Sequence, residues 1–231
     1  MKRVLFIGDG DHDIGKPEWP TDDAFPARGV VPLLAERVTA IDRPGSMAMH
    51  WAHPRLARFS VGRPTKTHGY PEKFRAAQLQ VEYGRLPVEG IVCVVDEDKK
   101  PERLQLPGNA QELTTKRCPI VCGVAVQSIE AWTLGALTAL ADVLGITIQK
   151  LRRACPAAPV EDLYEGSGKE GRQPKPLLNE LAERFAHRRD SLELREEVAA
   201  RTDIAELVTM CPTGFAPFAA ALRRCFGPPI V

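Results

Sequence analysis

Residues 90–98 read Gly-Ile-Val-Cys-Val-Val-Asp-Glu-Asp, an apolar run that stops abruptly at acidic residues. A continuous run rich in β-branched residues is typical of a strand that is buried on both faces of a parallel sheet. Ligands of open α/β sheets bind beyond the carboxyl ends of such strands. The stretch therefore predicts a central strand with a ligand site at its carboxyl end.

Two other apolar runs have the same character. Residues 4–7 read Val-Leu-Phe-Ile and stop at Gly8-Asp9-Gly10, and residues 119–126 lead to Ser128, a residue type that often begins helices. Helix-start signals and the helical spacing of apolar residues predict several helices. They are expected over 30–40, 71–85, 128–144, 175–188, 191–200 and 214–226.

Strands that alternate with helices favour an α/β fold with a three-layer core and a mainly parallel sheet. We expect this core over residues 1–145, with residues 41–71 as an insertion that includes a short strand near 58–61. After Gly145 the composition changes to Arg, Pro, Ala, Glu and Gly. Residues 146–231 are therefore expected to form a helical C-terminal subdomain that packs on the core.

The chain has 231 residues, with 31 Lys and Arg against 30 Asp and Glu, and a formal net charge of +1 at pH 7. This balance lacks the global positive field of many non-specific nucleic-acid binders, so contact with a polyanion requires a local basic patch or a metal ion. Basic residues cluster near 55–66, 99–103, 150–153 and 184–189. No stretch approaches the roughly 20 apolar residues of a membrane span, and the first apolar run is too short for a signal peptide, so a cytoplasmic protein is expected.

Acidic residues follow each of the three predicted strands. They are Asp9, Asp11 and Asp13 after the first strand, Asp96 and Asp98 after the second, and Glu130 after the third. Carboxylates from separate strand ends can converge on one hard cation such as Mg²⁺, which takes oxygen ligands. An Asp-x-Asp pair on an extended segment points both side chains to the same side, so Asp96 and Asp98 can reach one ion. We favour a metal site over three separate solvated turns, while Glu130 fits a ligand and a partner of the helix dipole equally well.

These motifs resemble those of the Toprim-fold domains of topoisomerases, primases and overcoming-lysogenisation-defect nucleases. The matching segments are Asp9-Gly10-x-x-Asp13, Asp96-x-Asp98 and Val126-Gln127-Ser128-Ile129-Glu130-Ala131-Trp132. The Glu-Ala-Trp sequence, Pro174-Lys175-Pro176 and the pair Phe215 and Phe218 are similar to a bacterial Toprim-like family often encoded beside ABC-type or SMC-like ATPases, in loci that look like antiphage defence. That family usually has Glu where this chain has Asp9 and Asp13.

The resemblance implies a metal-dependent nuclease or related phosphodiesterase that works with a partner ATPase on a nucleic-acid substrate, DNA or RNA. Asp96 and Asp98 would then hold Mg²⁺ or Mn²⁺, and Asp9 and Asp13 would complete the shell or act as acid or base. The expected metal ligands are Asp9, Asp13, Asp96, Asp98 and Glu130, and the expected catalytic residues are these five and Lys100. Lys99 and Lys100 fit phosphate contacts and a solvated turn about equally well. A homo-oligomer is compatible with these expectations.

Two other functions stay open. Asp9, in place of the family's Glu, fits a non-catalytic Toprim-like subunit that binds or regulates an ATPase complex. A metal-dependent phosphohydrolase of nucleotides or small phosphoesters would use the same acids. An ATP-binding loop is not expected at Gly166-Ser167-Gly168-Lys169, because Glu170 follows the lysine where a phosphate-binding loop has Ser or Thr.

Overall fold

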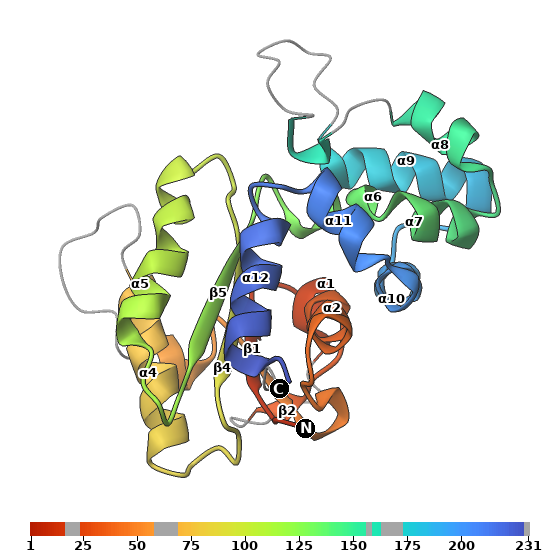
Figure 1. Ribbon diagram of the computed structural model, residues 1–231. Coiled ribbons are helices and arrows are strands. Elements are labelled where there is room, and N and C mark those ends of the chain that lie inside the picture. The colour runs from red at the N-terminus through yellow and green to blue at the C-terminus, as the bar shows by residue number, and fades with distance from the viewer. Residues whose placement is uncertain (17–23, 58–68, 156–158, 163–172, 229–231) are drawn as a thin grey trace.

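A five-stranded sheet lies at the centre of the computed structural model, which describes residues 1–16, 24–57, 69–155, 159–162 and 173–228 (Figure 1). The strands are β1 (Leu5–Gly8), β2 (Phe25–Pro26), β3 (Met47–His50), β4 (Ile91–Asp96) and β5 (Ile120–Ala125). Their order is β2-β3-β1-β4-β5, and neighbouring strands are parallel except for β2 and β3. The α/β class and the mainly parallel sheet, expected from the sequence, are confirmed.

The register of the sheet brings the ends of three strands to one edge. Leu5 of β1 pairs with Ile91 of β4, and Asp96 at the end of β4 pairs with Ala125 at the end of β5. Because these strands are parallel, the segments that follow them all leave the sheet on the same side, which we call the carboxyl edge. The acidic motifs of the sequence lie in these segments.

Helices cover both faces of the sheet and its carboxyl edge. The α-helices are α1 (Asp11–Ile14), α2 (Val30–Val38), α3 (Pro54–Ala57), α4 (Tyr70–Glu82), α5 (Leu106–Leu113), α6 (Ile129–Gly135), α7 (Leu137–Leu144), α8 (Ile148–Ala154), α9 (Pro174–Ala186), α10 (Leu192–Arg201), α11 (Ile204–Met210) and α12 (Phe215–Phe226). Short 3₁₀ turns cover Arg43–Gly45, Pro101–Gln105 and Val160–Asp162. No helix of the described ranges is long and apolar enough to cross a bilayer.

The sheet is the middle layer of three. Side chains alternate along its strands, so Leu5 and Ile7 pack into an apolar cluster with α4 and α5, while Val4 and Phe6 pack into a second cluster with α2 and α12. Figure 1 shows α4 and α5 on one side of the sheet and α12 and α2 on the other. The central strands are buried on both faces, as their continuous apolar runs predict.

Helix α12 closes one face of the sheet although it comes last in the described chain. It packs closely against β5, where a Cβ atom at Gly123 would lie only 2.7 Å from Cδ2 of Phe218. At Gly90 a Cβ atom would lie 2.6 Å from Cε1 of Phe226. Glycine at these two positions therefore lets the aromatic side chains of α12 lie directly on the sheet.

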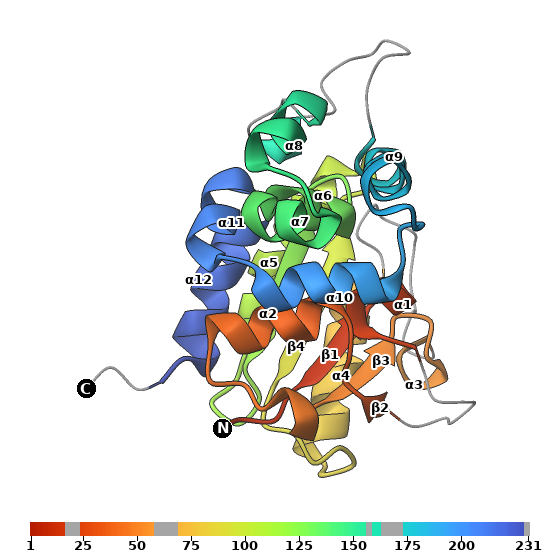
Figure 2. The ribbon, with the colours of Figure 1, turned by 90° about the vertical axis from the view of Figure 1, so that its right-hand side faces the viewer.

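A third apolar cluster joins α6, α7, α8, α9 and α10. Helix α10 contacts both α7 in this group and α2 on the sheet, and Figure 2 shows it lying between them. The helical group therefore lies over the carboxyl edge, next to the acidic motifs.

The structure differs from the sequence-based expectation in several places. The helix expected over 128–144 is divided into α6 and α7, because Ala136 between them leaves the helical conformation, with ψ of 60°. Strand β3 comes from the segment interpreted as an insertion. The elements that were not anticipated are β2, α1, α3, α5, α8 and α11. The strand expected near 58–61 lies outside the described residues, and the division at residue 145 stays a prediction.

Candidate functional site

Three carboxyl groups gather at the carboxyl edge. Asp96 is the last residue of β4, Asp13 lies in α1 directly after β1, and Glu130 lies in the first turn of α6 after β5. Oδ1 of Asp96 accepts a hydrogen bond of 2.9 Å from the backbone N–H of Ile129, which ties the end of β4 to the start of α6. We call Asp13, Asp96 and Glu130 the acidic cluster.

The three carboxyl groups interact electrostatically, as the pKa of Asp96 indicates. Burial raises the pKa of Asp96 to about 8, and the negative charges of Asp13 and Glu130 add to the rise. The hydrogen bond from Ile129 opposes it. A carboxyl group with so high a pKa lacks a full complement of positive charge around it, and a cation bound nearby would lower its pKa.

Asp13 is similarly placed. Its side chain is buried, and its Oδ2 atom accepts a hydrogen bond of 2.9 Å from the backbone N–H of Gly10. Burial raises the pKa of Asp13 to about 6, against that hydrogen bond, and the charges of Asp9 and Glu130 raise it further. In two members of the acidic cluster, Asp13 and Asp96, burial thus disfavours the ionised form, and the surrounding protein compensates for this only in part.

Glu130 differs because it has a buried cation as partner. Nη2 of Arg195, from α10, lies 2.9 Å from Oε1 of Glu130, and the Arg195 side chain is 1% exposed. Nε of Arg195 also donates to Oδ1 of Asp190 at 2.7 Å. Burial alone would raise the pKa of Glu130, but Arg195 and the hydroxyl of Ser128 hold it below its ordinary value. Glu130 is therefore ionised and fixed in place.

Asp98 lies on a turn rather than on an extended strand. Asp98 and Lys99 both have φ of 59°, in the left-handed region, so Asp96 and Asp98 do not share the extended backbone that would point both side chains to one side, and this prediction was wrong. The Asp98 side chain is 62% exposed and lies 3.5 Å from Nη1 of Arg103 and 3.8 Å from Nζ of Lys100.

Asp9 lies at the outer side of the same edge. It is exposed, and partial burial of its carboxyl group raises its pKa, against the opposing charges of Arg103 and Lys73. The nearby Asp11 pairs with His50, with 3.6 Å between Oδ1 and Nε2. Asp9 therefore belongs to the same electrostatic neighbourhood as the acidic cluster but lies closer to solvent.

Arg103, like Arg195, is a buried cation that was not predicted from the sequence. Its side chain is 10% exposed, it lies over the ring of Tyr70 at 5.6 Å, and its Nη1 donates to the backbone carbonyl of Asp96 at 2.5 Å. Lys100, which was predicted to be catalytic, is 48% exposed. Arg103 lies within the basic run 99–103 and differs from its neighbours in being buried. The burial of a residue in a polar turn cannot be predicted from the sequence.

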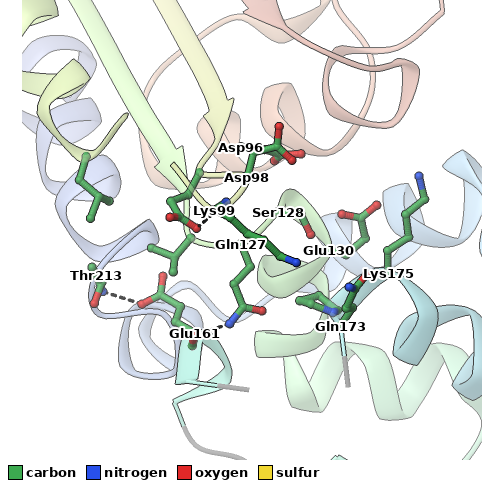
Figure 3. Close-up of a pocket in the computed structure, with 14 residues that line it drawn as sticks. Asp96, Asp98, Lys99, Gln127, Ser128, Glu130, Glu161, Gln173, Lys175 and Thr213 are labelled. Atoms are coloured by element: carbon green, nitrogen blue, oxygen red, sulfur yellow. Dashed lines mark hydrogen bonds between the residues drawn. The ribbon is translucent and has the colours of Figure 1, made fainter. Parts of the chain in front are cut away.

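A pocket of about 660 Å³ adjoins the acidic cluster (Figure 3). Asp96, Asp98 and Glu130 line it together with Lys99 and Lys175, whereas Asp9 and Asp13 are not among its lining residues. The pocket therefore brings carboxylates and ammonium groups to one cavity, as the binding of a metal ion with a phosphate requires.

Glu161, which lines the pocket on the side away from Glu130, has a structural role. Its carboxylate accepts hydrogen bonds of 2.7 Å from the backbone N–H groups of Thr213 and Gly214, next to the start of α12. Figure 3 shows Glu161 and Thr213 on the opposite side of the pocket from Glu130 and Lys175. Because both oxygens of Glu161 are engaged, it serves to hold α12 rather than to bind a ligand.

The donor set fits a hard divalent cation in its chemistry, since it consists of carboxyl oxygens, although Glu130 is already paired with Arg195. In the described part of the chain, however, no group of three or more His, Cys, Asp or Glu residues stands in a metal-binding arrangement. Of the five predicted ligands, Asp13, Asp96 and Glu130 are brought together, while Asp9 and Asp98 lie towards solvent. The metal itself stays a prediction.

Comparison with known proteins identifies no relative of this chain. No family model matches the chain, no curated protein matches it, and no solved structure matches it. The account of the site therefore rests on the geometry of the carboxyl edge.

Proposed function

We propose that the chain is a metal-dependent phosphodiesterase, a nuclease with a Toprim-like core that uses Mg²⁺ or Mn²⁺. The observation that carries the proposal is the acidic cluster itself, in which Asp13, Asp96 and Glu130 meet at the carboxyl edge beside a pocket of about 660 Å³. The Toprim resemblance supports a nucleic-acid substrate, a partner ATPase and a role in antiphage defence.

The acidic residues of the site would bind the cation. Asp96, Asp98 and Glu130 line the pocket and would hold the cation, and Asp13 increases the negative field behind Asp96. A bound divalent cation would supply Lewis-acid polarisation of a phosphate oxygen and an activated water.

Basic side chains from two directions complete the pocket. Lys99 lines it from the turn after β4, and Lys175 lines it from the first turn of α9. Both ammonium groups are suited to bind the non-bridging oxygens of a phosphate, where charge develops during cleavage. Arg103 holds the backbone at Asp96 and so keeps the acidic turn in place.

A cleavage assay tests the proposal. Wild-type protein with Mg²⁺ or Mn²⁺ is expected to cleave single- or double-stranded DNA or RNA, and Asp96→Asn is expected to abolish cleavage without loss of fold. Asp142→Asn, at an exposed position of α7, is the matched control and is expected to cleave like wild type. Equal cleavage by wild type and Asp96→Asn would remove the site assignment.

A second candidate is a non-catalytic subunit that binds or regulates an ATPase complex. The ion pair between Glu130 and Arg195 favours it, because a cation must compete with the guanidinium for that carboxylate. This function predicts a stable complex with the ATPase and no metal-dependent rise in melting temperature.

A further inference from the structure

Two basic segments that are far apart in the sequence meet on the helical group. Nζ of Lys150, in α8, lies 4.8 Å from the ring centroid of Phe185 in α9, and Cζ of Arg184 lies 5.0 Å from the same centroid. Lys150 and Arg153 are three residues apart on one helix and so share a face. Lys150 and Arg153 of α8 therefore share one surface with Arg184 of α9 around Phe185, with α8 and α9 adjacent in Figure 1.

This surface carries a concentrated positive charge in a chain whose net charge is only +1. Its exposed cations are Lys150, Arg153 and Arg184, and we call them the basic surface. None of the three forms an ion pair with an acid of the described ranges, whereas Arg188 pairs with Glu197 at 3.1 Å. Residues 148–155 contain no Asp or Glu, while the exposed Glu180 and Glu183 of α9 precede Arg184.

Such a surface fits a polyanion. Phe185 is half-buried, so part of its ring is accessible between the cations. Aromatic rings among basic side chains are typical of surfaces that bind single-stranded nucleic acid through phosphates and base stacking. A membrane surface would need large apolar side chains to insert beside the cations, and the exposed large apolar residues of the described chain, Met1, Tyr83 and Leu104, lie on other elements.

The basic surface is also connected to the candidate site. Lys175, in the first turn of α9, lines the pocket, and Arg184 and Phe185 lie at the other end of this 13-residue helix. At about 1.5 Å per residue, the two ends are roughly 18 Å apart. A flexible strand of nucleic acid that contacts the basic surface can therefore extend along α9 towards the pocket.

We propose that the basic surface binds the phosphate backbone of a single-stranded nucleic acid outside the pocket and so orients the strand towards the acidic cluster. The orienting role rests on the proposed function, whereas the binding itself does not. This surface would supply the local affinity that the near-neutral chain otherwise lacks.

The test is the binding of a fluorescent single-stranded oligonucleotide to full-length protein that carries Asp96→Asn, measured by anisotropy over a range of salt concentrations. The triple variant Lys150→Glu, Arg153→Glu and Arg184→Glu is compared with Arg85→Glu, Lys116→Glu and Arg117→Glu, which makes the same change in net charge at exposed positions away from α8 and α9. Melting temperatures verify folding, and the triple variant Lys150→Gln, Arg153→Gln and Arg184→Gln provides a milder change.

The proposal expects the first triple variant to weaken binding by about tenfold or more and to reduce the slope of log Kd against log salt by about 2, since each phosphate contact contributes about 0.7. The control is expected to bind like the parent. Equal weakening in both triple variants, or no binding by the parent protein, would overturn the proposal. Binding to vesicles with anionic lipid, without binding to the oligonucleotide, would assign the surface to a membrane instead.

Hydrolysis of bis(4-nitrophenyl) phosphate separates this inference from the proposed function. One outcome is that wild type binds the oligonucleotide through the basic surface without hydrolysing the ester or the oligonucleotide. This outcome would refute the proposed phosphodiesterase activity but not the proposed binding by the basic surface. Metal-dependent cleavage that depends on Asp96 but is unaffected by the triple variant at Lys150, Arg153 and Arg184 would refute the basic surface alone.

Discussion

Arg195 of α10 lies 2.9 Å from Glu130 of α6, and both side chains are almost completely buried. The contact joins residues 65 positions apart and connects the C-terminal helices directly to the acidic cluster. Removal of one partner from a buried ion pair leaves an uncompensated charge and typically costs about 3–5 kcal/mol. The position of Glu130 at the candidate site is thus determined by α10 as much as by α6.

Arg195→Met is expected to lower the free energy of unfolding by about 3 kcal/mol, because Glu130 and Asp190 would lose their shared cation. Arg188→Met is the control, since it removes a half-buried ion pair to Glu197, which lies on α10 like Arg195, and should cost less than about 1 kcal/mol. Urea denaturation at neutral pH measures both values. Similar losses in the two variants would show that the Glu130–Arg195 contact has no special role.

The stability of metal-free protein is expected to fall as the pH rises from about 4 to about 8. Asp96 has its pKa raised from 3.8 to about 8, so between these values the folded state holds a proton that the unfolded state has lost. Stability is then lost as the pH rises, with a limiting slope of about 1.4 kcal/mol per pH unit for one proton. Asp13, with its pKa raised to about 6, acts in the same direction at lower pH.

Asp96→Asn should reduce this dependence, since an amide imitates the protonated acid and keeps an oxygen for the N–H of Ile129. The variant is expected to exceed wild type in stability by a margin that is about 3–4 kcal/mol larger at pH 8 than at pH 5, because Asp96 stays protonated in the folded state over most of this range. Unfolding in the presence of a chelator at both pH values provides the measurement. A constant margin would contradict the raised pKa of Asp96.

Arg103 is expected to matter more than Lys100. Arg103→Met removes the buried donor to the carbonyl of Asp96 and should cost about 2 kcal/mol, while Lys100→Met, at an exposed position, should change stability by less than about 0.5 kcal/mol. The Arg103 variant should also cleave more slowly, because the turn that carries Asp96 and Asp98 would no longer be held in place. If Lys100→Met has the larger effect on stability, the role given to Arg103 is wrong.

The packing of α12 on β5 gives a direct test of the fold. Gly123→Ala places a Cβ atom 2.7 Å from Phe218 and should lower stability by about 1–3 kcal/mol, and Phe218→Leu should restore part of the loss. Gly108→Ala, in α5, meets no atom within 4 Å and should be neutral or stabilising by up to about 1 kcal/mol. Thermal denaturation of the three variants distinguishes these outcomes.

The sequence predicts the three strands that are buried on both faces, but it misses β2, which has only two residues, and β3, which is not marked by its residue types. β1, β4 and β5 are continuous apolar runs, whereas β3 reads Met-Ala-Met-His and has no β-branched residue. Its place beside β1 depends on the tertiary packing of the sheet. Short runs without a distinct pattern can become strands only because their neighbours provide hydrogen-bond partners.

Some residues of the candidate site can likewise be predicted from the sequence and others cannot. Asp13, Asp96 and Glu130 are identifiable because each follows an apolar run, and the parallel sheet brings such positions together. Arg195 and Arg103 are not, because their roles come from contacts with distant or turn residues and from burial in a polar environment. The counter-charges of an acidic cluster are therefore harder to predict than the acids.

A thermal-shift titration with Mg²⁺ and Mn²⁺ tests directly whether Asp96 and Asp98 bind a catalytic metal ion. Wild type is compared with the double variant Asp96→Asn and Asp98→Asn, alongside cleavage of single- and double-stranded DNA and RNA. We expect a metal-dependent rise in melting temperature and cleavage in wild type, with neither in the double variant. The same rise in both proteins, or no rise and no cleavage in wild type, would rule out the proposed metal site.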